Sequence, residues 1–447
     1  MDNRAGKIIT FYSYKGGTGR TMALANVGWI LASNGYDVLL IDWDLEAPGL
    51  HRFLRPFLFD SELTDTPGLI DFVWDGVRVS MTPAGTGSLA APKFPSLDDY
   101  AVVLDHDFAD GGSLSLIPAG QQDENYAQRV NTFNWEDFYQ RFGGGKLMQA
   151  ERDALRKRYD YILIDSRTGV SDTSGICTVQ MPDILVVLFT LNRQSITGAA
   201  AAAASIDATV RAKRNESIPI YPVPTRIEVA AEKERREAVI AYARRAFAPL
   251  LTHVQSTLDK VDLLQQSAYW QDVETPYVPF FAFEEILAAF KEETRTRNTV
   301  LGANERIAYW VSGRTVTGVH PEDEAWRNAV MGAYALKEAE APSFEWNPPL
   351  RVKRAWGRKV AAWLSSRRVS QWSTAAFACA VVFMGAQWYS ASSARQSAES
   401  RSDKLRQRMT SVADRVDTEA RKLPGLPIAY QTMEKTLRSL AKELQDP

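Results

Sequence analysis

Short apolar runs alternate with longer segments of helical periodicity across residues 5–310. The apolar runs that we interpret as strands lie at 7–13, 37–44, 114–118, 159–165, 184–189 and 218–223, and a last, proline-containing run at 277–283 is expected at a sheet edge. The expected helices cover 21–34, 199–213 and 230–251, with Gly35 placed to end the first of them. Strands alternating with helices in this way are typical of an α/β fold with a doubly wound, mostly parallel sheet.

A glycine-rich turn joins the first expected strand to the first helix. Its glycines, Gly16, Gly17 and Gly19, allow consecutive backbone N–H groups to face a phosphate. Thr21 can offer its hydroxyl to Mg²⁺, and the positive end of the following helix points at the same anion. The turn therefore predicts a site for a nucleoside triphosphate.

This turn departs from the general phosphate-loop pattern, because Tyr14 replaces its first glycine and Arg20 replaces its lysine. It resembles instead the deviant Walker A motif of the ParA/MinD P-loop ATPases. The resemblance implies that the loop binds ATP, with Thr18 among its ligands, and that Lys15 reaches across a nucleotide-sandwich homodimer to the partner's phosphates. Lysine carries a compact charge, whereas the guanidinium group of Arg20 is planar. A guanidinium group can also bind phosphate. We expect Arg20 to keep nucleotide binding and to act in catalysis, with slow or partner-stimulated hydrolysis.

Three aspartates end two of the expected buried strands. Asp42 and Asp44 follow one strand and Asp165 ends another, and the carboxyl ends of parallel strands meet beside the phosphate site. By resemblance, Asp44 orients or activates the attacking water, Asp42 supports the magnesium shell, and Asp165 is the Walker B carboxylate that holds Mg²⁺ through water. The alternative for each aspartate alone is an ordinary strand-end or cap residue.

Two arginines are further candidates. Arg167, directly after the third motif, can neutralise transition-state charge as arginine fingers do, or form a salt bridge with a nearby carboxylate. The resemblance also places Pro224, Thr225 and Arg226 near the adenine base. We therefore count Arg226 among the nucleotide-binding residues.

The composition agrees with a large α/β domain and gives little indication of other kinds of functional site. The chain has 447 residues, of which 45% are hydrophobic and 24% charged, and a net charge of −2. Two cysteines give no disulfide framework, and four scattered histidines show no metal-ligand spacing, so Mg²⁺ with the nucleotide is the only ion implied. The start of the chain leads directly into the first strand, without the pattern of a signal peptide.

The chain changes character near residue 340. A proline-rich linker and a basic stretch are followed by residues 369–394, which carry no charge. We interpret 369–391 as a single transmembrane helix with aromatic anchors at both ends; a buried helix of a water-soluble domain is the alternative. The basic flank and the location of ATP predict a cytoplasmic or inner membrane protein with its ATPase domain in the cytoplasm and its tail outside.

The expected organisation is an ATPase domain at 1–315, a helix and basic juxtamembrane linker at 316–368, the membrane span, and a helical tail at 392–447. Two apolar seams in the tail predict a helical hairpin or a pairing between protomers, with a frayed amphipathic tail as the alternative. We interpret residues 82–112 as a surface insertion that is either functional or disordered.

Two functions of different classes fit these observations. The first is a membrane-anchored ATPase that switches by nucleotide-dependent dimerisation and regulates a protein partner. The second is a membrane scaffold that binds nucleotide without hydrolysing it, with Arg20 as the sign of lost chemistry. A DNA-partition motor fits less well, because the net charge is negative and the basic residues concentrate beside the expected span. Nucleic acid is therefore not an expected partner.

Overall fold

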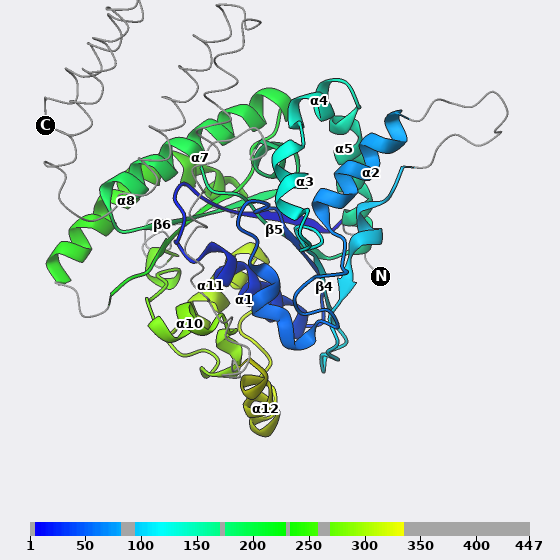
Figure 1. Ribbon diagram of the computed structural model, residues 1–447. Coiled ribbons are helices and arrows are strands. Elements are labelled where there is room, and N and C mark those ends of the chain that lie inside the picture. Colours follow the sequence, from blue (N-terminus) through cyan, green and yellow to red (C-terminus); the bar gives the residue numbers. More distant parts are fainter. Residues whose placement is uncertain (1–4, 82–93, 170–174, 229–232, 258–268, 335–447) are drawn as a thin grey trace, which may run out of the picture. The chain divides into compact units, whose positions relative to one another are not determined.

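The computed structural model describes residues 5–81, 94–169, 175–228, 233–257 and 269–334 (Figure 1). Most of the expected juxtamembrane linker, the expected span at 369–391 and the expected tail at 392–447 lie outside these ranges, as do residues 82–93. No helix in the described ranges has both the length and the hydropathy that membrane crossing requires.

A seven-stranded sheet forms the centre of the domain, in the order β3-β4-β2-β5-β1-β6-β7. All neighbouring strands are parallel except β3 and β4, which are antiparallel. The strands are β1 (Lys7–Ser13), β2 (Asp37–Asp42), β3 (Val102–Val103), β4 (Ser113–Ile117), β5 (Tyr161–Asp165), β6 (Ile184–Thr190) and β7 (Ile220–Thr225). The mostly parallel α/β sheet expected from the sequence is confirmed.

Alternate side chains of the central strands enter two separate hydrophobic cores, as the period of two requires. In β2, Val38 and Leu40 join one core, whereas Leu39 and Ile41 join the other. Both sheet faces are therefore buried, which explains why these strands read as continuous apolar runs.

Helices cover both faces of the sheet (Figure 1). Those contributing to the first core include α1 (Arg20–Ser33), α7 (Arg193–Arg214), α8 (Lys233–Thr257) and α11 (Val300–Val311). The second core receives α2 (Leu69–Met81), α5 (Gly144–Arg158) and the short α4 (Trp135–Gln140). The remaining helices are α3 (Tyr126–Thr132), α10 (Pro279–Glu284), α12 (Glu324–Tyr334) and the short turns η1 (Leu50–Phe57), η2 (Leu97–Tyr100), η3 (Ile176–Gln180) and η4 (Ala288–Phe290).

The end of α1 matches the sequence expectation. Gly35 has a φ of 83°, and its N–H donates to the carbonyl oxygen of Ala32 at 3.0 Å. Glycine adopts this left-handed conformation without steric cost, so it closes the helix and turns the chain into β2.

The prediction of a strand at 277–283 is wrong. These residues form the end of a loop and the helix α10, with Pro279 in its first turn, where the missing N–H of proline is not needed. Directly before this segment, Pro276 forms an isolated parallel bridge with Ile227. The sheet edge is instead β7, whose own prolines, Pro222 and Pro224, are compatible with an edge position.

The structure describes parts of two further regions that the sequence analysis discusses. In the described part of the 82–112 segment, η2 and β3 form, and β3 pairs with β4. α12 lies in the 316–368 segment, where a helix is expected, and belongs to the same compact unit as the sheet. Trp326 of α12 stacks against Trp29 of α1, with ring centroids 6.4 Å apart.

Candidate functional site

The glycine-rich turn lies between the end of β1 and the start of α1. Gly17 and Gly19 have φ values of 72° and 83°, a conformation that side chains with a Cβ rarely adopt. A Cβ built on Gly16 or Gly17 would meet no atom within 4 Å, so the space beside the turn is open. The turn thus combines a tightly curled backbone with room for a ligand at the carboxyl edge of the sheet.

Two of the three predicted carboxylates contact the first residues of α1. Asp44 accepts an ion-paired hydrogen bond from Nη2 of Arg20 at 2.7 Å, and Asp165 forms an ion pair with Nε of Arg20. Thr21 also donates its hydroxyl to Asp165 at 2.6 Å. The structure therefore brings together residues that lie far apart in the sequence.

Arg20 is the central cation of this arrangement. Its side chain is only 5% exposed, compared with 16% for Asp44 and 1% for Asp165. Burial disfavours the charged form of Arg20, but the charges of Asp165 and Asp44 outweigh this effect and raise its pKa above the ordinary value. Burial raises the pKa of Asp165, while its bonds to Arg20 and Thr21 favour its charged form. Arg20 therefore compensates the charge of two largely buried carboxylates.

Asp42 has a different environment from Asp44. It is buried, and it accepts hydrogen bonds from the backbone N–H groups of Asp44, Gly49 and Leu50, each at 3.2 Å. Burial, followed by the charge of Asp165, raises the pKa of Asp42 to about 8. Its contacts fix the turn that carries Asp44, and Asp42 is not among the residues lining the cavity described below. Its role at magnesium stays a prediction.

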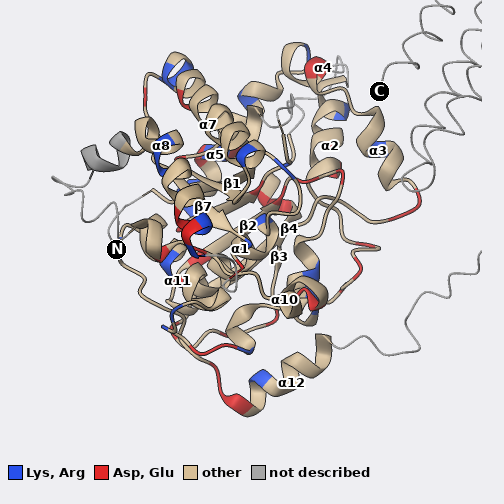
Figure 2. Cartoon of the chain, turned by 90° about the vertical axis from the view of Figure 1, so that its left-hand side faces the viewer, with Lys and Arg blue, Asp and Glu red and all other residues tan. Residues whose placement is uncertain are grey.

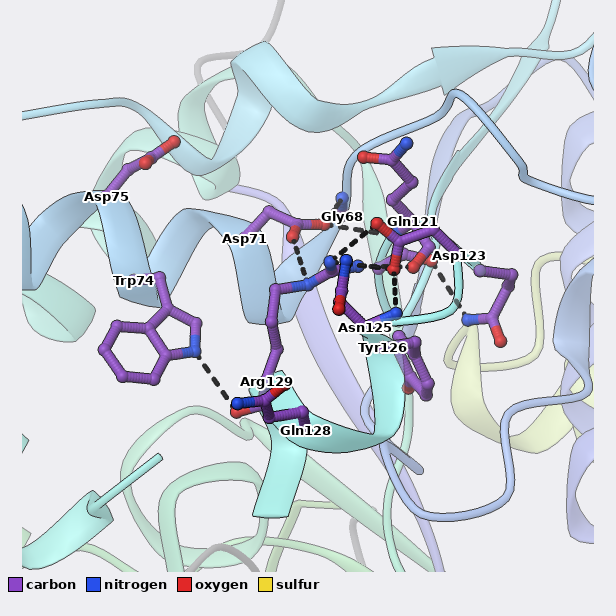
Figure 3. A network of polar contacts seen from close by, with 12 residues as sticks. Gly68, Asp71, Trp74, Asp75, Gln121, Asp123, Asn125, Tyr126, Gln128 and Arg129 are labelled. Carbon is purple, nitrogen blue, oxygen red and sulfur yellow. Dashed lines mark hydrogen bonds and ion pairs between the residues drawn. The ribbon is translucent and has the colours of Figure 1, made fainter. Parts of the chain in front are cut away.

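A second support for the Asp44 turn was missed by the sequence analysis. Tyr126 of α3 donates its hydroxyl to the carbonyl oxygen of Leu45 at 2.7 Å. Arg129, also on α3, pairs with Asp71 at 3.2 Å and with Asp123 at 2.8 Å, which ties α3 to α2 (Figure 3). Asp71 and Arg129 are 58 positions apart in the sequence, so no local motif predicts this network of contacts between α2 and α3.

Arg167 forms the salt bridge that was one of its two expected roles. Its Nη2 lies 2.6 Å from the Glu46 carboxylate, and both residues line the cavity beside the glycine turn. Lys15 donates to the side-chain oxygen of Gln194, at the beginning of α7 in the same chain. Lys15 is not one of the residues lining the cavity, so the structure leaves its expected role toward a partner's phosphates as a prediction.

The cavity next to the glycine turn measures about 450 Å³, within the usual range for small-ligand sites. Its lining also contains Thr225, the last residue of β7, and Arg226, which follows it, together with Thr275 and Tyr277. The Arg226 guanidinium lies 5.2 Å from the centre of the Tyr277 ring, close enough for a cation–π contact. Arg226 thus lies at the cavity as the resemblance implied, whereas Tyr277 and Phe281 were not anticipated.

The donor atoms fit Mg²⁺ bound together with nucleotide. Thr21, Asp44 and Asp165 offer hard oxygen ligands beside the phosphate turn, and Mg²⁺ usually binds one or two carboxylates, water and substrate phosphates. Within the described ranges, no group of three or more His, Cys, Asp or Glu side chains is arranged to hold a metal ion alone. Phosphate oxygens and water would therefore have to complete the coordination shell.

Comparison with known proteins assigns the family. The model of the CobQ/CobB/MinD/ParA nucleotide-binding domain matches residues 9–332. The chain therefore belongs to this family, and it is a MinD/ParA-type P-loop ATPase. The resemblance found in the sequence motifs is confirmed.

Several solved structures are similar to the chain at low sequence identity. The cell division ATPase MinD of Pyrococcus furiosus is 16% identical, with 69% of this chain and 99% of that chain covered and a TM-score of 0.41. MinD of Pyrococcus horikoshii, complexed with Mg-ADP, is 17% identical, with the same coverage and TM-score. A Cyanothece McdA–ATP complex is 18% identical, with 55% of this chain and 81% of that chain covered and a TM-score of 0.40. Among curated proteins there is no significant match.

Replacing Arg20 tests the ion pairs of this site. Arg20→Ala leaves Asp165 buried without its cation, and removing one partner of a buried pair typically costs about 3–5 kcal/mol. We expect a loss of that size in the free energy of unfolding, measured by chemical denaturation. Added Mg²⁺ should recover part of the loss, because Asp44 and Asp165 become available to it.

Arg167→Ala is the control, because it removes a more exposed ion pair that should contribute about 1 kcal/mol or less. An Arg20→Ala variant as stable as Arg167→Ala, and insensitive to Mg²⁺, would contradict the central role of Arg20.

Proposed function

We propose that the chain is a membrane-anchored, ATP-hydrolysing switch that dimerises on ATP and regulates a protein partner. The observation that carries this proposal is the convergence of Arg20, Asp44 and Asp165 on the glycine turn. Arg20 and Asp44 line the cavity, and the buried Asp165 is bonded to Arg20 and to Thr21. This grouping supports roles toward phosphate, water and metal, which phosphoryl transfer requires.

Each residue has a definite task in this proposal. The backbone N–H groups of the glycine turn bind the phosphates of ATP. Thr21 and Asp165 would hold Mg²⁺, which would neutralise charge on the phosphates. Asp44 accepts a proton from the attacking water; the water oxygen bonds to the γ-phosphorus while the bond to the leaving oxygen of ADP breaks.

Arg20 accounts for the slow turnover that we propose. Its guanidinium is bonded to the same two carboxylates that serve the water and the metal. Binding of ATP with Mg²⁺ must therefore exchange these ion pairs for contacts with phosphate. The exchange opposes formation of the catalytic arrangement, so a partner that stabilises the phosphate-bound position of Arg20 would accelerate hydrolysis.

A dimer would complete the site through Lys15. MinD/ParA family proteins typically dimerise, and Lys15 lies at the rim of the turn with its ammonium group on Gln194. In the proposed dimer, Lys15 leaves Gln194 and contacts the phosphates of the other copy. Hydrolysis would remove this contact and release the two copies.

The membrane anchor rests on the sequence beyond the described domain. Residues 369–391 lack charged side chains, and a basic segment precedes them. A helix of this length spans a bilayer, and the positive flank favours the cytoplasmic side. We infer a single-pass protein of the inner or cytoplasmic membrane, with the ATPase domain in the cytoplasm and the tail outside.

A non-hydrolysing membrane scaffold is the second candidate. It is favoured by one observation, the ion pair that holds Asp44 on Arg20. If this pair persisted with ATP bound, Asp44 could not act on water, and the chain would bind nucleotide without turnover.

ATP hydrolysis by the full chain separates the two candidates. We expect Asp44→Asn to reduce the rate of phosphate release about 100-fold or more, because a neutral amide cannot accept the proton of water. ATP binding should be retained, as measured by calorimetry. Asp137→Asn, a change at a more exposed carboxylate of α4, is the control and should hydrolyse ATP at the wild-type rate. If the wild type and Asp44→Asn released phosphate at the same background rate, the hydrolysing switch would be excluded and only the non-hydrolysing scaffold would remain.

Membrane extraction tests the proposed anchor. The wild-type chain should stay in the membrane fraction after washing with high salt and alkaline carbonate. Val382→Arg combined with Phe383→Arg should move it to the soluble fraction, because each arginine at a span centre costs about 2.5–3.5 kcal/mol. Ser397→Arg with Ala398→Arg adds the same charges beyond the expected span and should stay in the membrane. Release of the wild-type chain by the washes would contradict the anchor.

A further inference from the structure

A second cavity, separate from the glycine turn, is lined by many arginines. It measures about 600 Å³ and lies between α8, residues 271–274, residues 295–298 and the first part of α11. Figure 2 marks the basic residues of α8 and α11 in blue. The arginines lining the cavity are Arg236, Arg244, Arg295, Arg297 and Arg306.

The arginines that line the cavity outnumber its carboxylates. Glu305 is only 2% exposed and accepts hydrogen bonds from the Thr294 hydroxyl at 2.5 Å and from the backbone N–H groups of Arg295 at 2.7 Å and Val319 at 3.0 Å. Its carboxylate therefore anchors the loop before α11. Glu237 is paired with Lys233, one turn earlier on α8. The lining thus carries five arginines and four carboxylates, Glu237, Asp272, Glu274 and Glu305.

Two of the arginines have buried donors that lack a partner. The Nε atoms of Arg236 and Arg244 are inaccessible to solvent and have no hydrogen-bond partner in the described part of the chain. A buried donor without a partner carries a desolvation cost. Rotation of either side chain that turns its Nε toward an acceptor bound in the cavity would remove this cost. Arg236 and Arg244 also lie near Glu274, whose charged form they favour against the effect of burial.

We propose that this cavity binds a small phosphorylated ligand carrying at least two negative charges. Guanidinium groups remain charged at all physiological pH values and match phosphate oxygens in paired hydrogen bonds. A cavity of this volume suits a small molecule, and the surplus of arginines over available carboxylates selects an anion. Glu274 competes with the ligand for Arg236 and Arg244.

The site is connected to the nucleotide cavity through one short segment. Glu274 lines the arginine-rich cavity, whereas the next residue, Thr275, lines the nucleotide cavity together with Tyr277. Thr275 is held by its N–H, which donates to Pro224 at 3.0 Å, and by its carbonyl oxygen, which accepts from Ile227 at 3.1 Å. A ligand that draws Arg236 and Arg244 away from Glu274 therefore acts on the wall of the nucleotide cavity. This coupling rests on the proposed function, whereas anion binding does not.

Calorimetric titration of the full chain with inorganic pyrophosphate, in the presence of saturating ADP and Mg²⁺, tests the site. We expect one pyrophosphate per chain. Arg244→Gln should weaken binding at least tenfold, and Arg297→Gln, at a more exposed lining residue, should also weaken it. Arg245→Gln is the matched control, because this exposed neighbour on α8 does not line the cavity. Its affinity should remain within twofold of wild type.

Glu274→Gln provides a change in the opposite direction. Removal of the competing carboxylate should strengthen pyrophosphate binding several-fold, which a purely structural role of this residue would not do. Equal affinities of Arg244→Gln, Arg297→Gln and Arg245→Gln would overturn the proposal. Displacement of pyrophosphate by a short DNA duplex, with the same dependence on Arg244, would overturn the assignment to a small ligand. If pyrophosphate binds as expected but ATP is not hydrolysed, the anion site stands and the ATPase switch fails.

Discussion

The two ion pairs of Arg20 hold the nucleotide site together. β2 and β5 are neighbouring parallel strands, and their register places Asp42 opposite Asp165. Asp44, two residues after the end of β2, and Asp165 at the end of β5 would repel one another in a buried site, and the guanidinium of Arg20 supplies the compensating charge. Because Arg20 is also the first residue of α1, the same contacts fix the start of the helix relative to the sheet.

This arrangement makes the phosphate-binding residue part of the catalytic control. A lysine at position 20 would present a compact charge with no fixed plane, whereas arginine can bond to two carboxylates at once. The bonds of Arg20 to Asp44 and Asp165 are therefore a structural alternative to bonds with phosphate. In the proposed switch, the balance between these two sets of contacts determines how often the site is ready for hydrolysis. A ligand in the separate, arginine-rich cavity would act on the nucleotide cavity through the segment around Thr275.

The sequence predicted the parts of the fold that depend on local patterns. The strands around the glycine turn, the helix ended by Gly35 and the positions of Asp44 and Asp165 follow from apolar runs and turn residues. The strand predicted at 277–283 is not formed. Its aromatic residues suit a strand, but Pro279 is equally acceptable at a sheet edge or in the first turn of a helix. Tertiary packing decides between the two. The contacts of Arg20 and the Tyr126–Leu45 hydrogen bond depend on long-range packing, which one sequence does not display.

Nucleotide binding by the glycine turn is the claim on which the rest depends, and its most direct test is calorimetric titration of the full chain with ADP and Mg²⁺. The account predicts one ADP per chain, weaker binding when Mg²⁺ is chelated, and loss of binding in Gly17→Ala, where a Cβ is strained at a φ of 72°. Gly332→Ala, at an open position of α12, should bind like wild type. Unchanged ADP affinity in Gly17→Ala, or no uptake of ADP by the wild-type chain, would contradict the account.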